Sequence, residues 1–244
     1  MGGPPRPSDR IRLRRWLAAY AVLLLLALAL LAVLVAREPW HWAQWRGQFR
    51  PTFASAGPGV KLLAMGIYLS LCTTLLPLPT GWLIACVATR EAAVASTAWG
   101  TVLAVGLVGA AASTVANLNE YHLLTWMLRH PRIAALRRSR LHGAGARWFA
   151  RSPFLLVVAF NLLPIPLDVV RVLSATCRYP RGPFAAANLL GRFVRYAVIA
   201  FVTYWWDLGW AAAWVLLGLA VAVGLGRIGV SLFRRLLRTA GPAA

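Results

Sequence analysis

Residues 75–79 read LLPLP and residues 162–166 read LLPIP, so one proline-broken motif occurs twice in the chain. Each copy lies in the middle of an apolar stretch, 61–89 for the first and 153–176 for the second. Two prolines so close together remove two backbone donors and force the residue between them out of the helical region. We therefore expect each stretch to form two half-helices joined by a break. The prolines concerned are Pro77, Pro79, Pro164 and Pro166.

The pairing of the two breaks predicts an internal repeat. Paired interruptions in the two halves of a membrane protein are typical of inverted repeats whose broken helices meet at a transport site. If each stretch returns to the side from which it started, the two form opposed re-entrant hairpins whose tips meet near the middle of the bilayer. Chance similarity is the alternative, since Leu and Pro are frequent in this chain.

Composition places these hairpins in a membrane. The chain of 244 residues is 60% hydrophobic and 13% charged, whereas soluble domains are roughly 45–50% apolar and about 25% charged. Runs 17–36, 92–116, 184–206 and 208–226 are long and apolar enough to span. The first exceeds a signal-peptide core and lacks a clear cleavage site, which favours an uncleaved anchor. The prediction is an all-α polytopic membrane protein with about four spanning helices and two opposed proline-broken re-entrant hairpins.

This organisation divides the chain into three parts. Residues 1–60 hold a basic segment, the anchor helix and a Trp-rich interfacial loop. Residues 61–206 form a core with both hairpins, and residues 207–244 hold a final spanning helix and a basic tail.

The charge distribution predicts an orientation. The chain has 26 Lys and Arg against 6 Asp and Glu, a net charge of +20. The Arg residues lie between apolar runs and not along one polar face, which disfavours nucleic-acid binding and favours topology control and contact with anionic lipids. With two re-entrant hairpins, 18 basic residues fall on one side and 5 on the other. The positive-inside rule then predicts cytoplasmic termini. If both broken stretches spanned instead, the Arg-rich segment 129–151 would lie outside.

Charged residues after the second break are the first candidates for a site. Asp168 and Arg171 are three residues apart and share a face if the helix resumes there. An ionised group near the bilayer centre is costly, so we expect an ion pair that lines a polar cavity. The alternative is a structural pair that caps the broken helix.

A second pair of arginines, Arg192 and Arg195, lies early in the 184–206 run. These side chains are able to hold a phosphate by bidentate hydrogen bonds, or they only extend to the interface. Asn161 and Asn188 are uncharged candidates for the same polar lining, or each makes only a bond between helices. Glu120 is a possible proton carrier, with pairing to the nearby Arg cluster as the alternative.

Enzyme chemistry is not indicated. No two of the six acidic residues are closer than 29 positions, so no local carboxylate cluster is present to hold a metal. HExxH, P-loop and GxSxG motifs are absent. The three cysteines are scattered, without a CxxC pair. We therefore expect no catalytic residue, no cofactor and no metal site.

From Pro77 to Tyr204 the chain resembles the DedA family, the VTT-domain or SNARE-associated Golgi protein superfamily. The most specific part is FNLLPIPLDVVR followed by F-x-x-x-N-x-x-G-R, which runs from Phe160 through Arg171 and from Phe184 to Arg192. Many members carry Glu where this chain has Gly81, and the usual Gly-Arg after Tyr121 is replaced by Leu124 and Thr125. The resemblance implies two opposed re-entrant hairpins and movement of lipids between leaflets, while the departures leave proton coupling and substrate identity open.

The expected function is therefore a lipid translocase that moves anionic, polyprenyl phosphate-type headgroups between leaflets. Its partners are membrane lipids and no nucleic acid. The alternatives are a carrier for a small anion and a non-transporting assembly or envelope-integrity protein. Arg outnumbers Lys 25 to 1, which is typical of a GC-rich bacterial genome and indicates the bacterial cytoplasmic membrane.

Overall fold

The computed structural model describes residues 7–37, 53–72, 80–128, 140–163 and 169–206, together with positions 215 and 218. The regular structure in these ranges is helical, without a strand. The predicted fourth span, 208–226, lies outside the described residues except for those two positions, and so do Pro77, Pro79, Pro164, Pro166 and Asp168. The elements are α1 (Pro7–Arg37), α4 (Pro58–Cys72), α5 (Gly81–Val87), α6 (Ala98–Met127), α8 (Arg140–Arg151), α9 (Pro153–Leu162), α10 (Val169–Thr176) and α11 (Arg181–Trp205).

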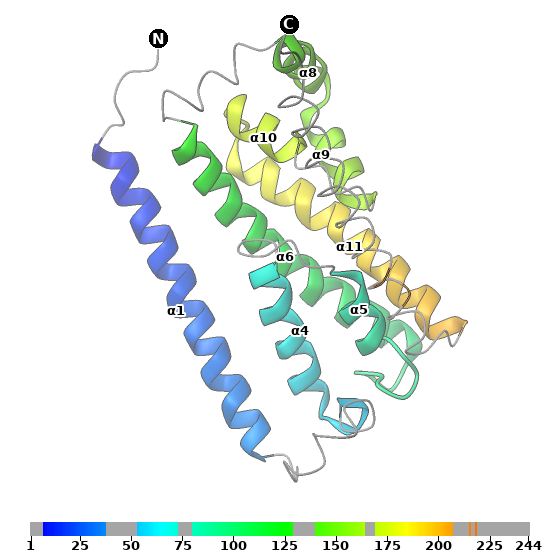
Figure 1. Ribbon diagram of the computed structural model, residues 1–244. Helices are drawn as coiled ribbons and strands as arrows, with labels where there is room; N and C mark the ends of the chain where they lie inside the picture. Colours follow the sequence, from blue (N-terminus) through cyan, green and yellow to red (C-terminus); the bar gives the residue numbers. More distant parts are fainter. Residues whose placement is uncertain are drawn as a thin grey trace, which may run out of the picture.

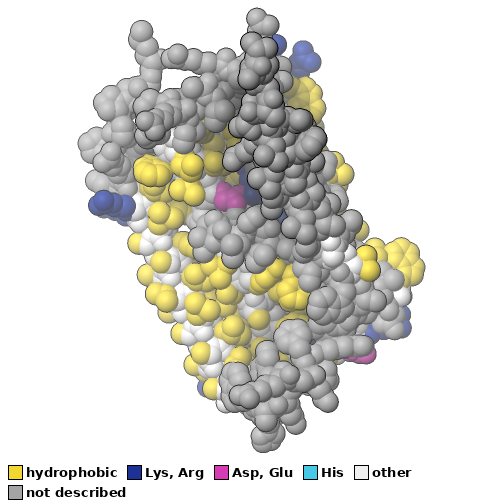
Figure 2. Space-filling model, in the orientation of Figure 1, with side chains coloured by type: hydrophobic (Ala, Val, Ile, Leu, Met, Phe, Trp, Pro, Cys, Tyr) yellow, Lys and Arg dark blue, Asp and Glu magenta, His cyan; other side chains and the backbone are white. Residues whose placement is uncertain are grey.

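Three helices in the described ranges are long and apolar enough to cross a membrane. They cover Leu13–Arg37, Ala98–Met127 and Arg181–Trp205, with mean hydropathies of 2.9, 1.7 and 1.4. The most apolar stretch of α1 has no buried residue, so its leucines and valines require an apolar surrounding outside the chain. Hydrophobic side chains also cover much of the described surface in Figure 2. The expectation of an all-α membrane protein is confirmed at this level.

The second of these helices starts later than the sequence pattern indicates. Thr97 has extended φ and ψ angles of −116° and 149°, and its hydroxyl accepts a hydrogen bond from the Gly100 amide at 3.0 Å. This N-cap satisfies a free donor of the first turn. The helix therefore begins at Ala98 and not at Ala92, and it continues to Met127.

Helices α6 and α11 form the long antiparallel pair at the centre of the molecule (Figure 1). Small residues on α6 allow large side chains of α11 to approach closely. A Cβ atom at Gly109 would lie 2.9 Å from the Tyr196 ring, and one at Gly106 would lie 3.1 Å from Phe193. Further along the pair, the rings of Tyr121 and Phe184 are 5.0 Å apart.

The first proline motif falls between α4 and α5, and the chain reverses there. The Trp82 indole donates to the Tyr68 hydroxyl at 2.7 Å, and the Lys61 ammonium donates to the Ala92 carbonyl at 3.1 Å. Residues on the two sides of the motif are thus neighbours. Both helices lie over the lower half of α6 in Figure 1.

The second motif falls between α9 and α10, at the other end of the central pair. Leu163 after α9 is extended, with φ −74° and ψ 139°. Phe149 of α8, before α9, meets Tyr179, after α10, with ring centroids 5.7 Å apart. The chain therefore also returns to the end from which it came, and α8, α9 and α10 lie in the upper half of Figure 1.

Helix α8 was not anticipated, since residues 129–151 were expected to form a loop. Phe149 is buried, while Arg147, Trp148 and Arg151 are exposed. Two apolar clusters result in the described molecule. One joins α4 and α5 to the central pair, and the other joins α8, α9 and α10 to it.

Candidate functional site

Arg192 is the most deeply buried arginine among the described side chains, with 5% of its surface exposed. Its Nε donates to Asn161 Oδ1 of α9 at 3.0 Å, and its Nη1 donates to the Tyr196 hydroxyl at 2.9 Å. Asn161 is fixed in turn, since its Nδ2 donates to the Val157 carbonyl at 2.8 Å. The structure thus brings together two predicted site residues, Asn161 and Arg192.

Close approach of α9 to α11 makes this contact possible. A Cβ atom at Gly191 would lie 2.6 Å from the Val158 carbonyl oxygen and 2.8 Å from the Asn161 Cβ. Such distances are too short for a non-bonded contact. A glycine beside Arg192 is therefore needed for Asn161 to reach the guanidinium.

Tyr196 connects this arginine to the opposite half of the molecule. Its hydroxyl lies 2.8 Å from Ser113 Oγ of α6, its ring packs in the apolar cluster that includes α4 and α5, and the side chain of Thr80, just before α5, lies close to it. Thr80 directly follows the first proline motif, and Asn161 directly precedes the second. Side chains from the two chain reversals therefore meet through Arg192 and Tyr196.

A second polar contact lies one helical turn along α11 from Arg192. Asn117 Nδ2 donates to Asn188 Oδ1 at 2.7 Å, and Asn188 Nδ2 donates to the Phe184 carbonyl at 2.7 Å. Asn188 was predicted as part of the lining, and it here forms a bond between α6 and α11. Within the described ranges, the buried Asn117 Oδ1 and Thr114 Oγ1 have no hydrogen-bond partner. Buried polar atoms without partners are uncommon in proteins.

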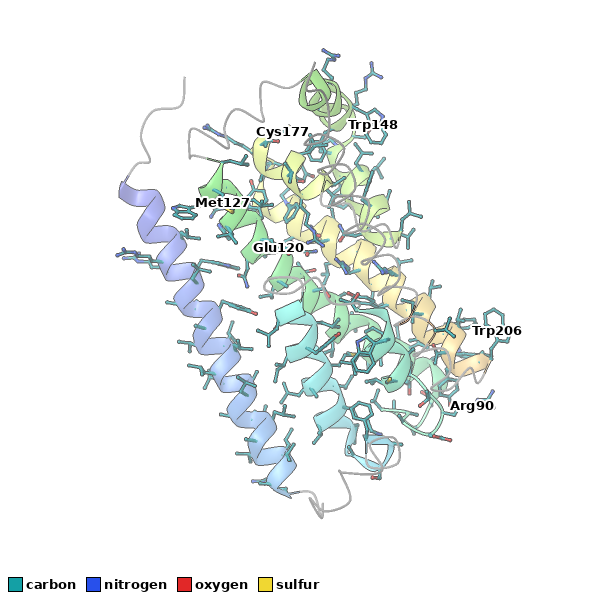
Figure 3. All side chains as sticks on the ribbon, viewed as in Figure 1. Arg90, Glu120, Met127, Trp148, Cys177 and Trp206 are labelled. Atoms are coloured by element: carbon teal, nitrogen blue, oxygen red, sulfur yellow. The ribbon has the colours of Figure 1, made fainter. Side chains whose placement is uncertain are left out.

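The third polar contact is an ion pair between Arg171 of α10 and Glu120 of α6. The two side chains are 20% and 19% exposed, and Figure 3 shows Glu120 on the inner side of α6. Arg171 was expected to pair with Asp168, and that prediction lies outside the described residues. The structure shows Glu120 as a partner of Arg171. The sequence does not reveal this pair, because its members are 51 positions apart.

Arg195 lies one turn from Arg192 on α11 and is half-buried. It is close enough to interact electrostatically with Arg192 and Tyr196. Within the described part of the chain, neither arginine has a carboxylate at ion-pair distance. Two positive charges therefore lie close together on α11 without a described counter-ion.

This arrangement is suited to binding an anion. A buried charge without a partner is strongly disfavoured, and among the described residues Arg192 has two hydrogen bonds, both to neutral side chains. A guanidinium has five N–H donors that match phosphate geometry. In the part of the chain that the structure describes, no group of three His, Cys, Asp or Glu residues is placed to hold a metal ion.

Sequence reasoning missed Ser113, Tyr196 and Thr80. Tyr196 lies four positions after Arg192, so it follows the same helix face, and that spacing was an available signal. Ser113 and Thr80 gave no comparable signal, because their roles depend on which faces of distant helices meet.

Comparison with family models, with curated proteins and with solved structures finds no match.

Proposed function

We propose that the protein is a membrane lipid translocase in which Arg192 binds an anionic headgroup, such as a phosphate, while it crosses between leaflets. The observation that carries the proposal is the buried Arg192, placed where side chains from both chain reversals meet and lacking a described carboxylate partner. A phosphate is a suitable counter-ion, since it accepts bidentate hydrogen bonds from arginine.

The proposed topology makes each chain reversal a re-entrant hairpin. Helices α4 and α5 are too short to cross a bilayer, with 15 and 7 residues, and so are α9 and α10, with 10 and 8; a spanning helix needs about 20. Each pair starts and ends at the same end of the central helices. Opposed re-entrant hairpins are also what the resemblance to the DedA family implies.

The orientation follows from the exposed arginines. The end of the molecule that carries α8 has six among the described side chains, and the opposite end has two. The first group contains Arg14, Arg15, Arg147, Arg151, Arg178 and Arg181, and the second contains Arg37 and Arg90. By the positive-inside rule the α8 end lies in the cytoplasm, and a bacterial cytoplasmic membrane is the proposed location.

The polar pairs form a track for the headgroup. From the α8 end the order along the central helices is Glu120 with Arg171, Asn117 with Asn188, and then Arg192 with Arg195. In this account Arg171 exchanges Glu120 for the incoming phosphate, and the phosphate then moves to Arg192. The acyl or prenyl chains stay in hydrocarbon, since leaving it would cost about 0.8 kcal/mol per CH₂ group.

The direct test is leaflet exchange of fluorescent phosphatidylglycerol in reconstituted vesicles. We expect Arg192→Gln to lower the exchange rate about tenfold or more, because removing one partner of a buried charged contact costs about 2–5 kcal/mol. Arg192→Lys keeps the charge but loses the planar donor fork, and we expect an intermediate rate. Arg37→Gln removes one exposed charge at the end of α1 and serves as the matched control.

Three outcomes would contradict the proposal. Uptake of inorganic phosphate without lipid exchange would make the chain a carrier for a small anion. The absence of both lipid exchange and phosphate uptake in vesicles that contain folded protein would support a non-transporting role. Unchanged exchange in folded Arg192→Gln would remove this residue from the mechanism.

A further inference from the structure

Helix α8 has two unlike faces. Phe149 is buried against Tyr179, and a Cβ atom at Gly145 would lie 3.4 Å from the Leu173 side chain, so this face is attached to the second hairpin. Arg147 and Arg151 are four positions apart and share the opposite, exposed face.

The segment after α10 brings two more arginines to the same place. The contact between Phe149 and Tyr179 sets the end of α8 beside residues 178–181, where Arg178 and Arg181 are both exposed. We call these four residues the basic collar: Arg147, Arg151, Arg178 and Arg181. Of the acidic side chains that the structure describes, Glu120 is paired with Arg171, and Glu91 follows α5 at the opposite end. The collar is therefore a positive surface without a described acidic neighbour.

Exposed aromatic side chains at this end of the molecule indicate that the collar lies at a membrane surface. Trp148 is 54% exposed on α8, and Trp126 is 50% exposed near the end of α6. Figure 3 shows Trp148 pointing outward from the upper end of the molecule. Exposed tryptophans next to arginines are typical of helices that lie in the headgroup region.

We infer that the basic collar is a binding surface for anionic phospholipid headgroups of one leaflet and collects them for the second hairpin. The delivery of the headgroup to the second hairpin rests on the proposed function, whereas the binding to the collar does not. Arg171 lies roughly 8 Å along α10 from Thr176, the residue at the collar end of that helix. A headgroup on the collar is therefore close to the first ion pair of the polar track.

The native cysteines allow a local measurement. Cys177 is exposed and directly precedes Arg178 of the collar, and Cys86 is buried. In a Cys72→Ala/Cys86→Ala background, Cys177 carries a fluorophore, and the full chain is reconstituted in phosphatidylcholine vesicles. The probe lipid is phosphatidylglycerol or phosphatidylcholine with a nitroxide near the headgroup, which quenches the fluorophore on contact.

We expect phosphatidylglycerol to quench about threefold more efficiently than phosphatidylcholine, because each arginine near the surface attracts anionic lipid. Arg147→Gln/Arg151→Gln should bring the ratio close to one, and high salt should lower it. Arg147→Lys/Arg151→Lys should keep the native quenching ratio, which separates loss of charge from misfolding. Arg14→Gln/Arg15→Gln is the matched control, since it removes two exposed arginines from α1 at the same end.

Equal quenching by the two lipids in the native protein would overturn the inference, and so would an unchanged ratio in the Gln variant. Equal quenching together with tight binding of a labelled oligonucleotide would assign the collar to nucleic acid and also overturn it. The measurement contains no transport step. A failure here therefore leaves the role of Arg192 standing, and a failure of Arg192 in transport leaves lipid binding by the collar intact.

Discussion

Hydrogen bonds from three elements fix the position of the Arg192 guanidinium. Asn161 comes from α9, Tyr196 from α11 itself, and Ser113 reaches Tyr196 from α6. The tyrosine hydroxyl accepts from Arg192 Nη1 and shares a second hydrogen bond with Ser113. Positioned donors in a dry site need little reorganisation when an anion binds, which is the physical reason for this support.

Tyr196→Phe tests that support. The substitution removes the hydroxyl and leaves an Arg192 donor and the Ser113 hydroxyl without a partner, so we expect a loss of about 1–3 kcal/mol in stability and a lower rate of lipid exchange. Thermal unfolding in detergent and vesicle exchange measure the two effects. Tyr204→Phe on the same helix is the control, because the Arg90 contacts involve its ring and its carbonyl oxygen and not its hydroxyl. Equal unfolding curves for Tyr196→Phe and the native chain would contradict the proposed role.

The pair of Arg171 and Glu120 is suited to a double-mutant cycle. Arg171→Gln and Glu120→Gln each leave a partly buried charge without this partner, and the double variant removes both charges. We expect a coupling energy of about 1 kcal/mol from the unfolding free energies, since contacting residues couple by 0.5–3 kcal/mol and partial exposure weakens ion pairs. Additive losses would show that the two charges do not stabilise each other.

At the residue scale, the sequence pointed to polar residues of the candidate site but not to most of the contacts between them. Arg171, Arg192 and Asn161 stood out because polar groups in apolar runs are costly. Glu120 was noted as a proton carrier, a role that stays a prediction, but its pairing with Arg171 was not foreseen. Helical spacing predicts neighbours on one helix only, and contacts between helices depend on packing.

Among the elements, the contact of α9 with α11 depends most on a single residue. Gly191 has no side chain at the point where the backbone of α9 comes closest. The same approach places Asn161 beside Arg192. The geometry of α9 therefore affects both packing and the site.

Gly191→Ala should separate the two helices. The added Cβ would overlap the Val158 carbonyl, and we expect a loss of about 1–3 kcal/mol in stability, typical of overpacking. Gly182→Ala on the same helix is a matched control, since its Cβ would meet no heavy atom within 4 Å. Thermal unfolding of both variants checks this prediction, and a Gly191→Ala chain as stable as Gly182→Ala would contradict it.

The ends of the elements show what local sequence can and cannot predict. The structure describes helices before and after each proline motif, while the motifs themselves lie outside the described residues, so the predicted breaks stay predictions. The start of α6 was displaced because the Thr97 cap outweighs the apolar pattern that begins at Ala92. Helix α8 was missed because its many arginines indicated a loop, and its apolar face becomes evident only beside Tyr179.

For the whole molecule, the described ranges confirm an all-α protein with three helices of spanning length. Composition alone was sufficient for that prediction, because apolar runs of this length require a second apolar solvent. The number of spans and the sides of the membrane remain predictions from charge. The two chain reversals at opposite ends of α6 and α11 are the structural basis for proposing opposed hairpins.

The measurement that tests this central claim most directly is the accessibility of single cysteines on either side of each proposed hairpin. In the Cys72→Ala/Cys86→Ala background, exposed positions are Ser55 and Ser96 around the first chain reversal and Ala150 and Cys177 around the second. Each variant with an introduced cysteine also carries Cys177→Ala, so that it has one cysteine only. We expect an impermeant maleimide to label Ser55→Cys and Ser96→Cys in intact cells, and Ala150→Cys and native Cys177 only after permeabilisation. Labelling of the two members of either pair from opposite sides would show a spanning segment and would contradict the account.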